Sequence, residues 1–369
     1  MQSVVTILPP LPRELEPTDI ETAGRYFDCD AVPTGAVVVG SSVYASFGDG
    51  QVRVFRPDLP MQEVPAHNGA ILCMACHNSG VLTGGDDGRV LYLDADTGVT
   101  EFVRFGGSWV DCVATHAKGA WVASVGKTAH LTDVGGRVHT LDHPSTVGGM
   151  AFDRKGERLA VAHYGGVTLW TRGRRDWKAS SLKWAGSHGA VTWSPDNRFL
   201  VTTMQENALH GWRLRDKADM RMSGYPAKVK SMDWVGKLPH LASSGAGEAI
   251  CWPFDGANGP MGQRPLTLCH DGETLVTAVA ELPGHDGLLA GFDNGVVLYS
   301  ALDRLANPRV IKRGSGAAIT HLVVTPDSCW MLAAAEDGLL LWTPLGAAQF
   351  GLFKPEPPLD TKPDRPHHA

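Results

Sequence analysis

The stretch HNGAILCMACHNSGVLTGGDDGRVLYLD, residues 67–94, contains three short apolar runs separated by two polar turns. The second of these turns is the tight sequence Asp86-Asp87-Gly88. Glycine in such a turn takes the positive φ that a short hairpin needs. The stretch therefore predicts three antiparallel strands joined by hairpins.

The same motif of three apolar runs and two polar turns recurs eight times along the 369 residues of the chain. Its third apolar run ends in an aromatic residue in six of the eight copies, and the ends lie 38 to 47 residues apart. These ends are Phe55, Leu93, Thr132, Trp170, Trp212, Trp252, Tyr299 and Trp342. A period near 40 with three or four short strands per unit is typical of a propeller blade.

The repeats therefore predict an all-β fold, a single closed β-propeller of four-stranded antiparallel blades. We expect eight blades, one for each copy of the motif. Seven is the alternative, and it would apply if the first unit, Ala36–Phe55, is not a blade.

Three segments are predicted. Residues 1–33 are Pro-rich and acidic and form an extended lead-in, residues 34–353 form the propeller, and residues 354–369 are a Pro-rich tail expected to be disordered. The ring needs one more strand to close, because an unpaired edge strand invites aggregation. Either Arg25–Cys29 or Ala347–Phe353 can supply that strand.

Charge and composition exclude several classes of function. The net charge of −6 argues against a nucleic-acid partner, and the short basic run Arg172–Lys178 is interpreted as a solvated loop. No apolar run is long enough to cross a bilayer, so no membrane partner is expected. The N-terminus lacks a secretion signal, and the odd number of seven cysteines favours reduced thiols. A cytoplasmic location is expected.

Residues 67–94 are similar to a blade of the WD-repeat (WD40) β-propeller family. In that family a His before the first strand pairs with an Asp of the tight turn. The resemblance therefore implies a bracing hydrogen bond between His67 and Asp86, with Thr83 as a third member. It covers roughly Ala36–Phe353.

The chain departs from the family pattern in two ways. None of its eleven tryptophans is followed by Asp, and only His67 and His188 lie where a bracing His is expected. The chain is identified as a degenerate, bacterial-type member whose blades depend on packing more than on polar bracing.

Three short motifs resemble sequences that bind cofactors, metals or phosphate. Cys73-Met-Ala-Cys76-His77 matches a haem attachment sequence, Asp94-Ala-Asp96-Thr-Gly98 resembles the start of a calcium loop, and Gly126-Lys127-Thr128 resembles part of a phosphate loop. Each lacks the rest of its pattern. We interpret them as a strand, a turn and a hairpin, and we expect no cofactor, metal or catalytic residue.

The favoured function is a non-catalytic scaffold, a rigid propeller that presents its loops to a protein partner, as a monomer or as a subunit of a larger complex. Binding residues are expected on loops that lead into first strands or at tight turns. The candidates are Trp109, His188, Tyr225, Lys228 and Lys230.

The alternative is an enzyme or metal-handling propeller with its site at the axial channel. That reading requires inward-pointing polar side chains from at least three first strands. Asp111, Asp233 and His321 are the candidates.

Overall fold

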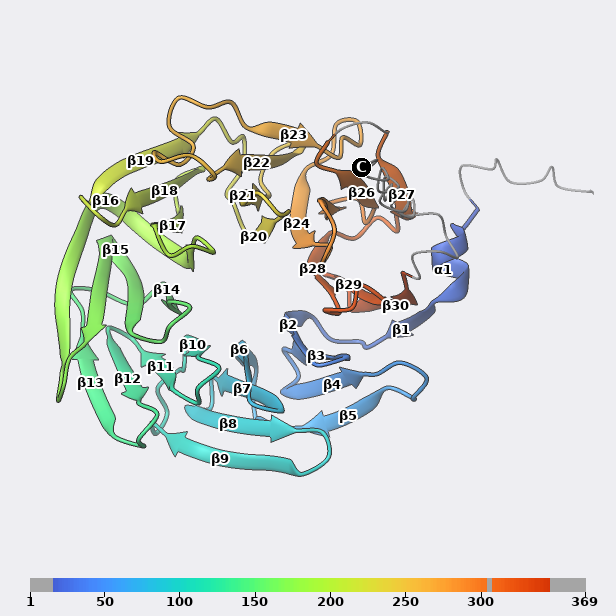
Figure 1. The fold of residues 1–369 in the computed structure, drawn as a ribbon. Helices are drawn as coiled ribbons and strands as arrows, with labels where there is room; N and C mark the ends of the chain where they lie inside the picture. Colours follow the sequence, from blue (N-terminus) through green and yellow to red (C-terminus); the bar gives the residue numbers. More distant parts are fainter. Residues whose placement is uncertain (1–15, 304–306, 346–369) are drawn as a thin grey trace, which may run out of the picture.

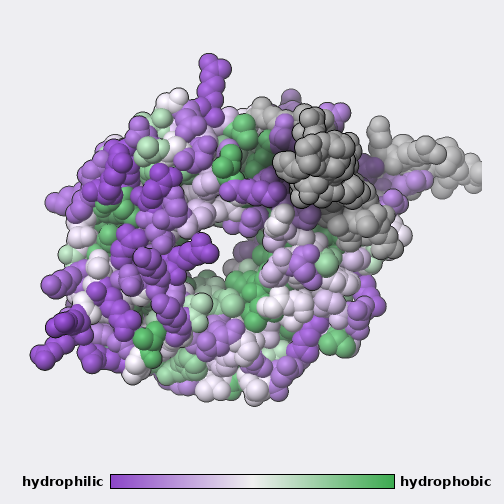
Figure 2. Space-filling view, viewed as in Figure 1, coloured by the Kyte–Doolittle hydropathy of each residue, from purple (hydrophilic) through white to green (hydrophobic). Residues whose placement is uncertain are grey.

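The computed structural model describes residues 16–303 and 307–345, which form a ring of antiparallel sheets around a central channel (Figure 1). The first strand of each repeat lies innermost, and later strands lie progressively farther out. The space-filling view in Figure 2 shows that the ring stays open at its centre.

Six of the seven sheets have four strands. Three of them follow the lead-in: β2 (Pro33–Val39), β3 (Ser42–Phe47), β4 (Gln51–Phe55) and β5 (Gln62–Pro65); β6 (Ile71–His77), β7 (Gly80–Gly85), β8 (Arg89–Asp94) and β9 (Gly98–Arg104); and β10 (Cys112–Thr115), β11 (Trp121–Val125), β12 (Thr128–Thr132) and β13 (Val138–Asp142).

Two further four-stranded sheets lie later in the chain. They are β20 (Met232–Val235), β21 (His240–Ser243), β22 (Ala249–Pro253) and β23 (Leu266–Leu268), and β24 (Val276–Glu281), β25 (Gly287–Phe292), β26 (Val297–Ala301) and β27 (Arg309–Lys312). The last combines β28 (Ile319–Val324), β29 (Trp330–Ala335) and β30 (Leu339–Pro344) with β1 (Arg25–Asp28).

The seventh sheet has six strands, in the order of the chain. They are β14 (Gly149–Phe152), β15 (Arg158–Arg172), β16 (Trp177–Trp193), β17 (Phe199–Met204), β18 (Ala208–Arg213) and β19 (Ala218–Ser223). This sheet contains the fourth and fifth repeats of the sequence. The expected count of eight separate blades is therefore wrong, and the alternative of seven agrees with the seven sheets.

The number of sheets is not reduced at the first unit, as the sequence suggested, because that unit forms the sheet β2–β5. It occurs where the fourth and fifth repeats meet. There Tyr164 pairs with Ser187, which couples the turn of one repeat to the first strand of the next. The two repeats share one sheet because β16 is continuous: it pairs with β15 through residues 177–183 and with β17 through residues 188–193.

Inside the merged sheet the chain still follows the repeat. The Arg172 amide donates to the Glu157 carbonyl over 2.8 Å, and His163 Nε2 lies 2.9 Å from Thr168 Oγ1. Residues five apart in an extended strand would be separated by about 16 Å. β15 therefore folds back on itself, at Gly165 and Gly166, whose φ values are +92° and +134°.

The N-terminal strand closes the ring. β1 pairs antiparallel with β30, with Arg25 opposite Trp342 and Asp28 opposite Leu339 (Figure 1). The lead-in is not wholly extended, because a short helix, α1 (Asp19–Ala23), precedes β1 and buries Ile20. The other proposed closing strand, Ala347–Phe353, lies outside the described residues.

The core lies between neighbouring sheets. One cluster joins Val122 and Leu131 of the third sheet to Leu159 and Val161 of the merged sheet. The aromatic ends of the repeats occupy these layers, and Trp212 is only 1% exposed. Because aromatic side chains bury a large apolar area, they give each repeat much of its packing energy.

Candidate functional site

The two ends of the ring carry different loops. Because successive strands are antiparallel, the loops that enter first strands and the hairpins that follow second strands lie at one end. We call this end the tight-turn face. The turns after first and third strands lie at the other end, which we call the opposite face.

Three of the five predicted binding residues are exposed on the tight-turn face. Trp109, in the loop before β10, is 61% exposed, which is unusual for an aromatic of this size. Lys228 and Lys230 are exposed in the loop before β20, and Lys228 Nζ donates to Gln205 Oε1 over 2.7 Å. Tyr164, which the sequence reasoning missed, is 66% exposed at the fold-back of β15. Its position beside two glycines of a tight turn was the available signal.

The other two candidates are buried, which corrects their assignment as binding residues. His188 Nδ1 lies 2.8 Å from Thr202 Oγ1 of β17. The Tyr225 hydroxyl lies 2.7 Å from Ser243 Oγ of β21 and accepts a hydrogen bond from Trp252 Nε1 over 2.6 Å. His188 therefore ties β16 to β17, and Tyr225 ties the loop before β20 to the second and third strands of its own sheet.

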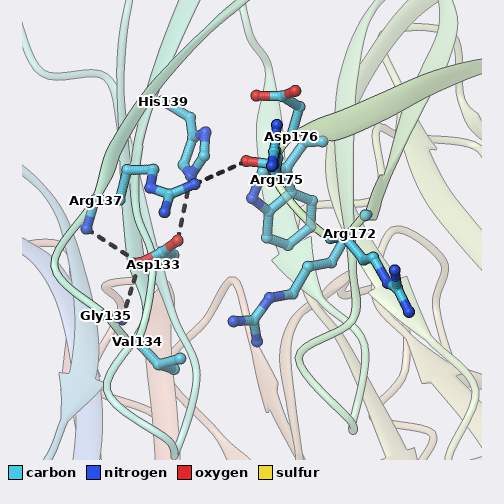
Figure 3. A pocket seen from close by; sticks show the side chains of 11 residues that line it. Asp133, Val134, Gly135, Arg137, His139, Arg172, Arg175 and Asp176 are labelled. Carbon is cyan, nitrogen blue, oxygen red and sulfur yellow. Dashed lines mark hydrogen bonds and ion pairs between the residues drawn. The ribbon is translucent and has the colours of Figure 1, made fainter.

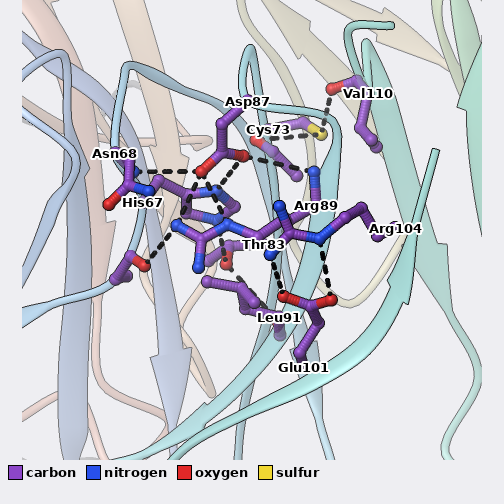
Figure 4. Close-up of polar contacts among 12 residues, drawn as sticks. His67, Asn68, Cys73, Thr83, Asp87, Arg89, Leu91, Glu101, Arg104 and Val110 are labelled. Carbon is purple, nitrogen blue, oxygen red and sulfur yellow. Dashed lines mark hydrogen bonds and ion pairs between the residues drawn. The ribbon is translucent and has the colours of Figure 1, made fainter. Parts of the chain in front are cut away.

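The best-matched repeat is held by a polar network centred on Asp87 (Figure 4). His67 Nδ1 lies 2.9 Å from Asp87 Oδ1, and His67 Nε2 lies 2.9 Å from Thr83 Oγ1. Asp87 Oδ2 also accepts hydrogen bonds from the Asn68 amide at 3.0 Å and from Arg89 Nε at 2.8 Å. The predicted partner of His67, Asp86, is therefore wrong. The partner is Asp87, and the Asp86 side chain lies against Gly69.

Electrostatics agree with this geometry. Burial acts to raise the pKa of Asp87, but hydrogen bonds from His67, Asn68 and Arg89 outweigh it and hold that pKa well below its usual value. Burial also lowers the pKa of His67, partly opposed by Asp87. The network is therefore a neutral imidazole held by an ionised carboxylate and a guanidinium.

We predict that Asp87→Asn lowers the free energy of unfolding by about 2 kcal/mol, because charge-assisted hydrogen bonds to Arg89 and His67 are weakened. Asp86→Asn is the matched control, and we expect a change within about 0.5 kcal/mol. Urea denaturation measures both. Equal destabilisation by the two variants would contradict this assignment.

A comparable hydrogen-bonded brace, which was not predicted from the sequence, lies before β14. Trp170 Nε1 donates to His143 Nε2 over 3.0 Å, and His143 Nδ1 lies 3.1 Å from the Lys127 carbonyl oxygen. His143 lies before β14, as His67 lies before β6. Only its position relative to Trp170 could have revealed it.

Histidine burial makes the fold sensitive to acid. His210 stacks on Trp184 with ring centroids 4.1 Å apart, and neither ring nitrogen has a hydrogen-bond partner within the described residues. Burial is the main cause that lowers the pKa of His210 to about 4.

We predict that thermal stability falls as the pH drops from about 6.5 towards 4. In this interval His210 is protonated in the unfolded chain and stays neutral in the folded chain, because folding lowers its pKa. His210→Phe keeps the stacking and removes the titrating group, so its melting temperature should depend less on pH in this interval. An unchanged pH dependence in that variant would exclude His210 as a source.

The residues proposed for an axial site do not converge. Asp233 accepts the amides of Glu281 and Trp234, each over 2.9 Å, and burial raises its pKa. Burial lowers the pKa of His321, partly opposed by a hydrogen bond to the Pro33 backbone. Asp111 Oδ2 accepts the Gly126 amide at 3.4 Å. Within the described residues no group of three or more His, Cys, Asp or Glu side chains is arranged to hold a metal ion.

The three chemistry-like motifs are structural elements. Cys73–His77 belongs to β6, where Cys73 Sγ contacts the Val110 carbonyl and Cys76 is exposed. Asp94 Oδ1 accepts the amides of Asp96 and Thr97 in the turn between β8 and β9. Gly126 and Lys127 form the hairpin between β11 and β12.

Comparisons with known proteins agree with the fold. The profile of the family described as "WD domain, G-beta repeat" matches residues 59–92. A search of curated proteins finds no match. Among solved structures, a crystal structure of the computationally designed Ika8 protein is 17% identical, with a TM-score of 0.67, and the match covers 86% of this chain and 97% of that one. At this identity the likeness concerns the fold alone.

Proposed function

From the premise that this chain is a WD40 β-propeller, we propose that it is a non-catalytic scaffold whose tight-turn face binds a protein partner. Propellers of this family generally mediate protein–protein interactions. The observation that carries the proposal is the exposure of Trp109 at that face.

Trp109 is suited to an interface because exposing its indole to water is unfavourable, and burying it against a partner recovers that energy. Its loop is fixed at both sides. Before Trp109, the Phe105 amide donates to the Gly88 carbonyl over 2.7 Å, and after it the Val110 amide donates to the Gly85 carbonyl over 3.1 Å. A pre-organised loop loses little entropy on binding.

Lys228 and Lys230 add positive charge to the same face of a protein whose net charge is −6. Their local charge favours a partner surface with acidic groups around an apolar centre that receives Trp109. The buried polar residues, by contrast, are committed to bracing, as His188 and Tyr225 illustrate.

We propose the cytoplasm as the site of action. Six of the seven cysteines are free thiols, as expected in a reducing compartment: Cys29, Cys73, Cys76, Cys112, Cys269 and Cys329. Among the described residues no helix has the length and apolar character needed to cross a membrane. The alternative of an axial enzyme or metal site is less favoured, because Asp111 and Asp233 bond to nearby backbone amides.

Comparative affinity capture from the native host tests this proposal. The face variant Trp109→Ala/Lys228→Ala/Lys230→Ala should keep its melting temperature and lose the stoichiometric partner that the unmodified protein retains. The control Lys155→Ala/Leu238→Ala removes an exposed cation and an exposed apolar side chain from the opposite face. Retention of the partner by the face variant would overturn the proposal.

A further inference from the structure

A pocket of about 260 Å³ lies on the opposite face, between the turn that joins β12 to β13 and the turn that joins β15 to β16 (Figure 3). We call it the arginine pocket. Its charged lining consists of Asp133, Arg137, His139, Arg172, Arg174, Arg175 and Asp176. We propose that it binds an acidic segment of a partner protein through the side-chain carboxylates of that segment.

One wall of the pocket is a rigid turn whose acidic group is already committed. Asp133 Oδ1 accepts the amides of Gly135 and Arg137 over 2.8 and 3.0 Å, and Asp133 Oδ2 lies 3.3 Å from His139 Nε2 (Figure 3). Arg137 Nη1 donates to the Arg175 carbonyl over 3.0 Å and ties the two turns together. The walls are therefore positioned before any ligand arrives.

The other wall carries cations without partners. Arg172, Arg174 and Arg175 are exposed, and within the described residues none of them forms an ion pair. Two other arginines of the same face have carboxylate partners nearby in the sequence. Arg158 pairs with Asp153 at 2.9 Å, and Arg213 pairs with Asp216 at 2.7 Å.

Three guanidinium groups without ion-pair partners line one pocket, beside Asp133 and Asp176, in a protein that is acidic overall, and a bound anion would add the charge that offsets them. Hydrophilic side chains gather over the part of the ring around β13 to β19 in Figure 2.

The chemistry favours carboxylates over a phosphate. Phosphate sites typically use free backbone amides, but the Gly135 and Arg137 amides bond to Asp133, and the Gly173 amide bonds to the Asp176 carbonyl over 2.9 Å. What remains is a set of guanidinium forks spread over one turn. Such forks match planar carboxylates in bidentate pairs.

This inference rests on the proposed function in that the ligand belongs to a protein partner. The pocket nevertheless lies at the other end of the ring from Trp109. Binding at the arginine pocket and binding at the tight-turn face can therefore be tested separately.

The test measures fluorescence anisotropy of labelled hexaglutamate and hexaglutamine peptides with the purified full chain. Hexaglutamate should bind the unmodified protein more tightly, and high salt should weaken it. Arg172→Gln/Arg174→Gln/Arg175→Gln should raise the Kd by about tenfold or more, since several charge-assisted bonds are lost. The charge-matched control Lys155→Gln/Arg215→Gln/Lys217→Gln, on neighbouring turns of the same face, should change it by less than about threefold.

Equal weakening in both triple variants would reduce the binding to general attraction and overturn the site. Failure of hexaglutamate to bind better than hexaglutamine would do the same. Displacement of the peptide by low concentrations of inorganic phosphate would replace the carboxylate with a phosphate ligand. None of these results involves the Trp109 face variant, so the proposed function would stand or fall on its own capture experiment.

Discussion

Replacing Trp212 with alanine is expected to lower the free energy of unfolding by about 3–5 kcal/mol. Trp212 ends the third strand of its repeat and is 1% exposed. Its ring lies 4.7 Å from the His210 ring and 5.5 Å from the His188 ring, measured between centroids. Removing the indole leaves a cavity in the layer that packs the merged sheet, and the rigid strands around it cannot collapse to fill it.

Trp109→Ala is the matched control for this experiment. The same chemical deletion at a side chain that is 61% exposed should change the free energy of unfolding by no more than about 0.5 kcal/mol. Urea denaturation monitored by circular dichroism measures both variants. Similar losses in the two would contradict the assignment of Trp212 to the core and Trp109 to a binding face.

Deleting residues 1–28 is expected to abolish the soluble monomer. The deletion removes β1 and exposes the edge of the apolar strand β30 from Leu339 to Trp342. It also removes Ile20 from the core and breaks the hydrogen bond from Thr18 Oγ1 to the Ile311 carbonyl. Among the residues that the structure describes, the ring is then held by the contacts between its remaining sheets.

Size-exclusion chromatography with light scattering measures this effect. Deletion of residues 1–15 serves as control and should keep the elution of the monomer, because β1 and α1 remain. A monomeric protein of unchanged melting temperature after removal of residues 1–28 would show that β1 does not hold the ring closed.

The repeat was readable from the sequence because its signals are local. Alternating apolar runs, a tight turn such as Asp86-Asp87-Gly88 and a terminal aromatic such as Trp212 each act within one unit. The sheet count could not be predicted, because it depends on β16 continuing from the fourth repeat into the fifth. Whether a strand continues across two repeats is decided by the packing between them.

The candidate site was predictable in part, because the position of a loop can be predicted from the repeat but the direction of its side chains cannot. Loop position correctly placed Trp109, Lys228 and Lys230 at the surface. It could not show that His188 and Tyr225 turn inward, because their direction depends on Thr202 and Ser243 of the second strands. The choice of Asp87 over Asp86 likewise depends on which carboxylate the turn directs towards His67.

Hydrogen–deuterium exchange of the protein, alone and bound to its captured partner, tests the central claim most directly. If the tight-turn face binds the partner, amides in residues 106–111 and 226–231 should exchange more slowly in the complex, while the buried strand β17 should exchange at an unchanged rate. Unchanged exchange in both of these loops within a stable complex would contradict the account.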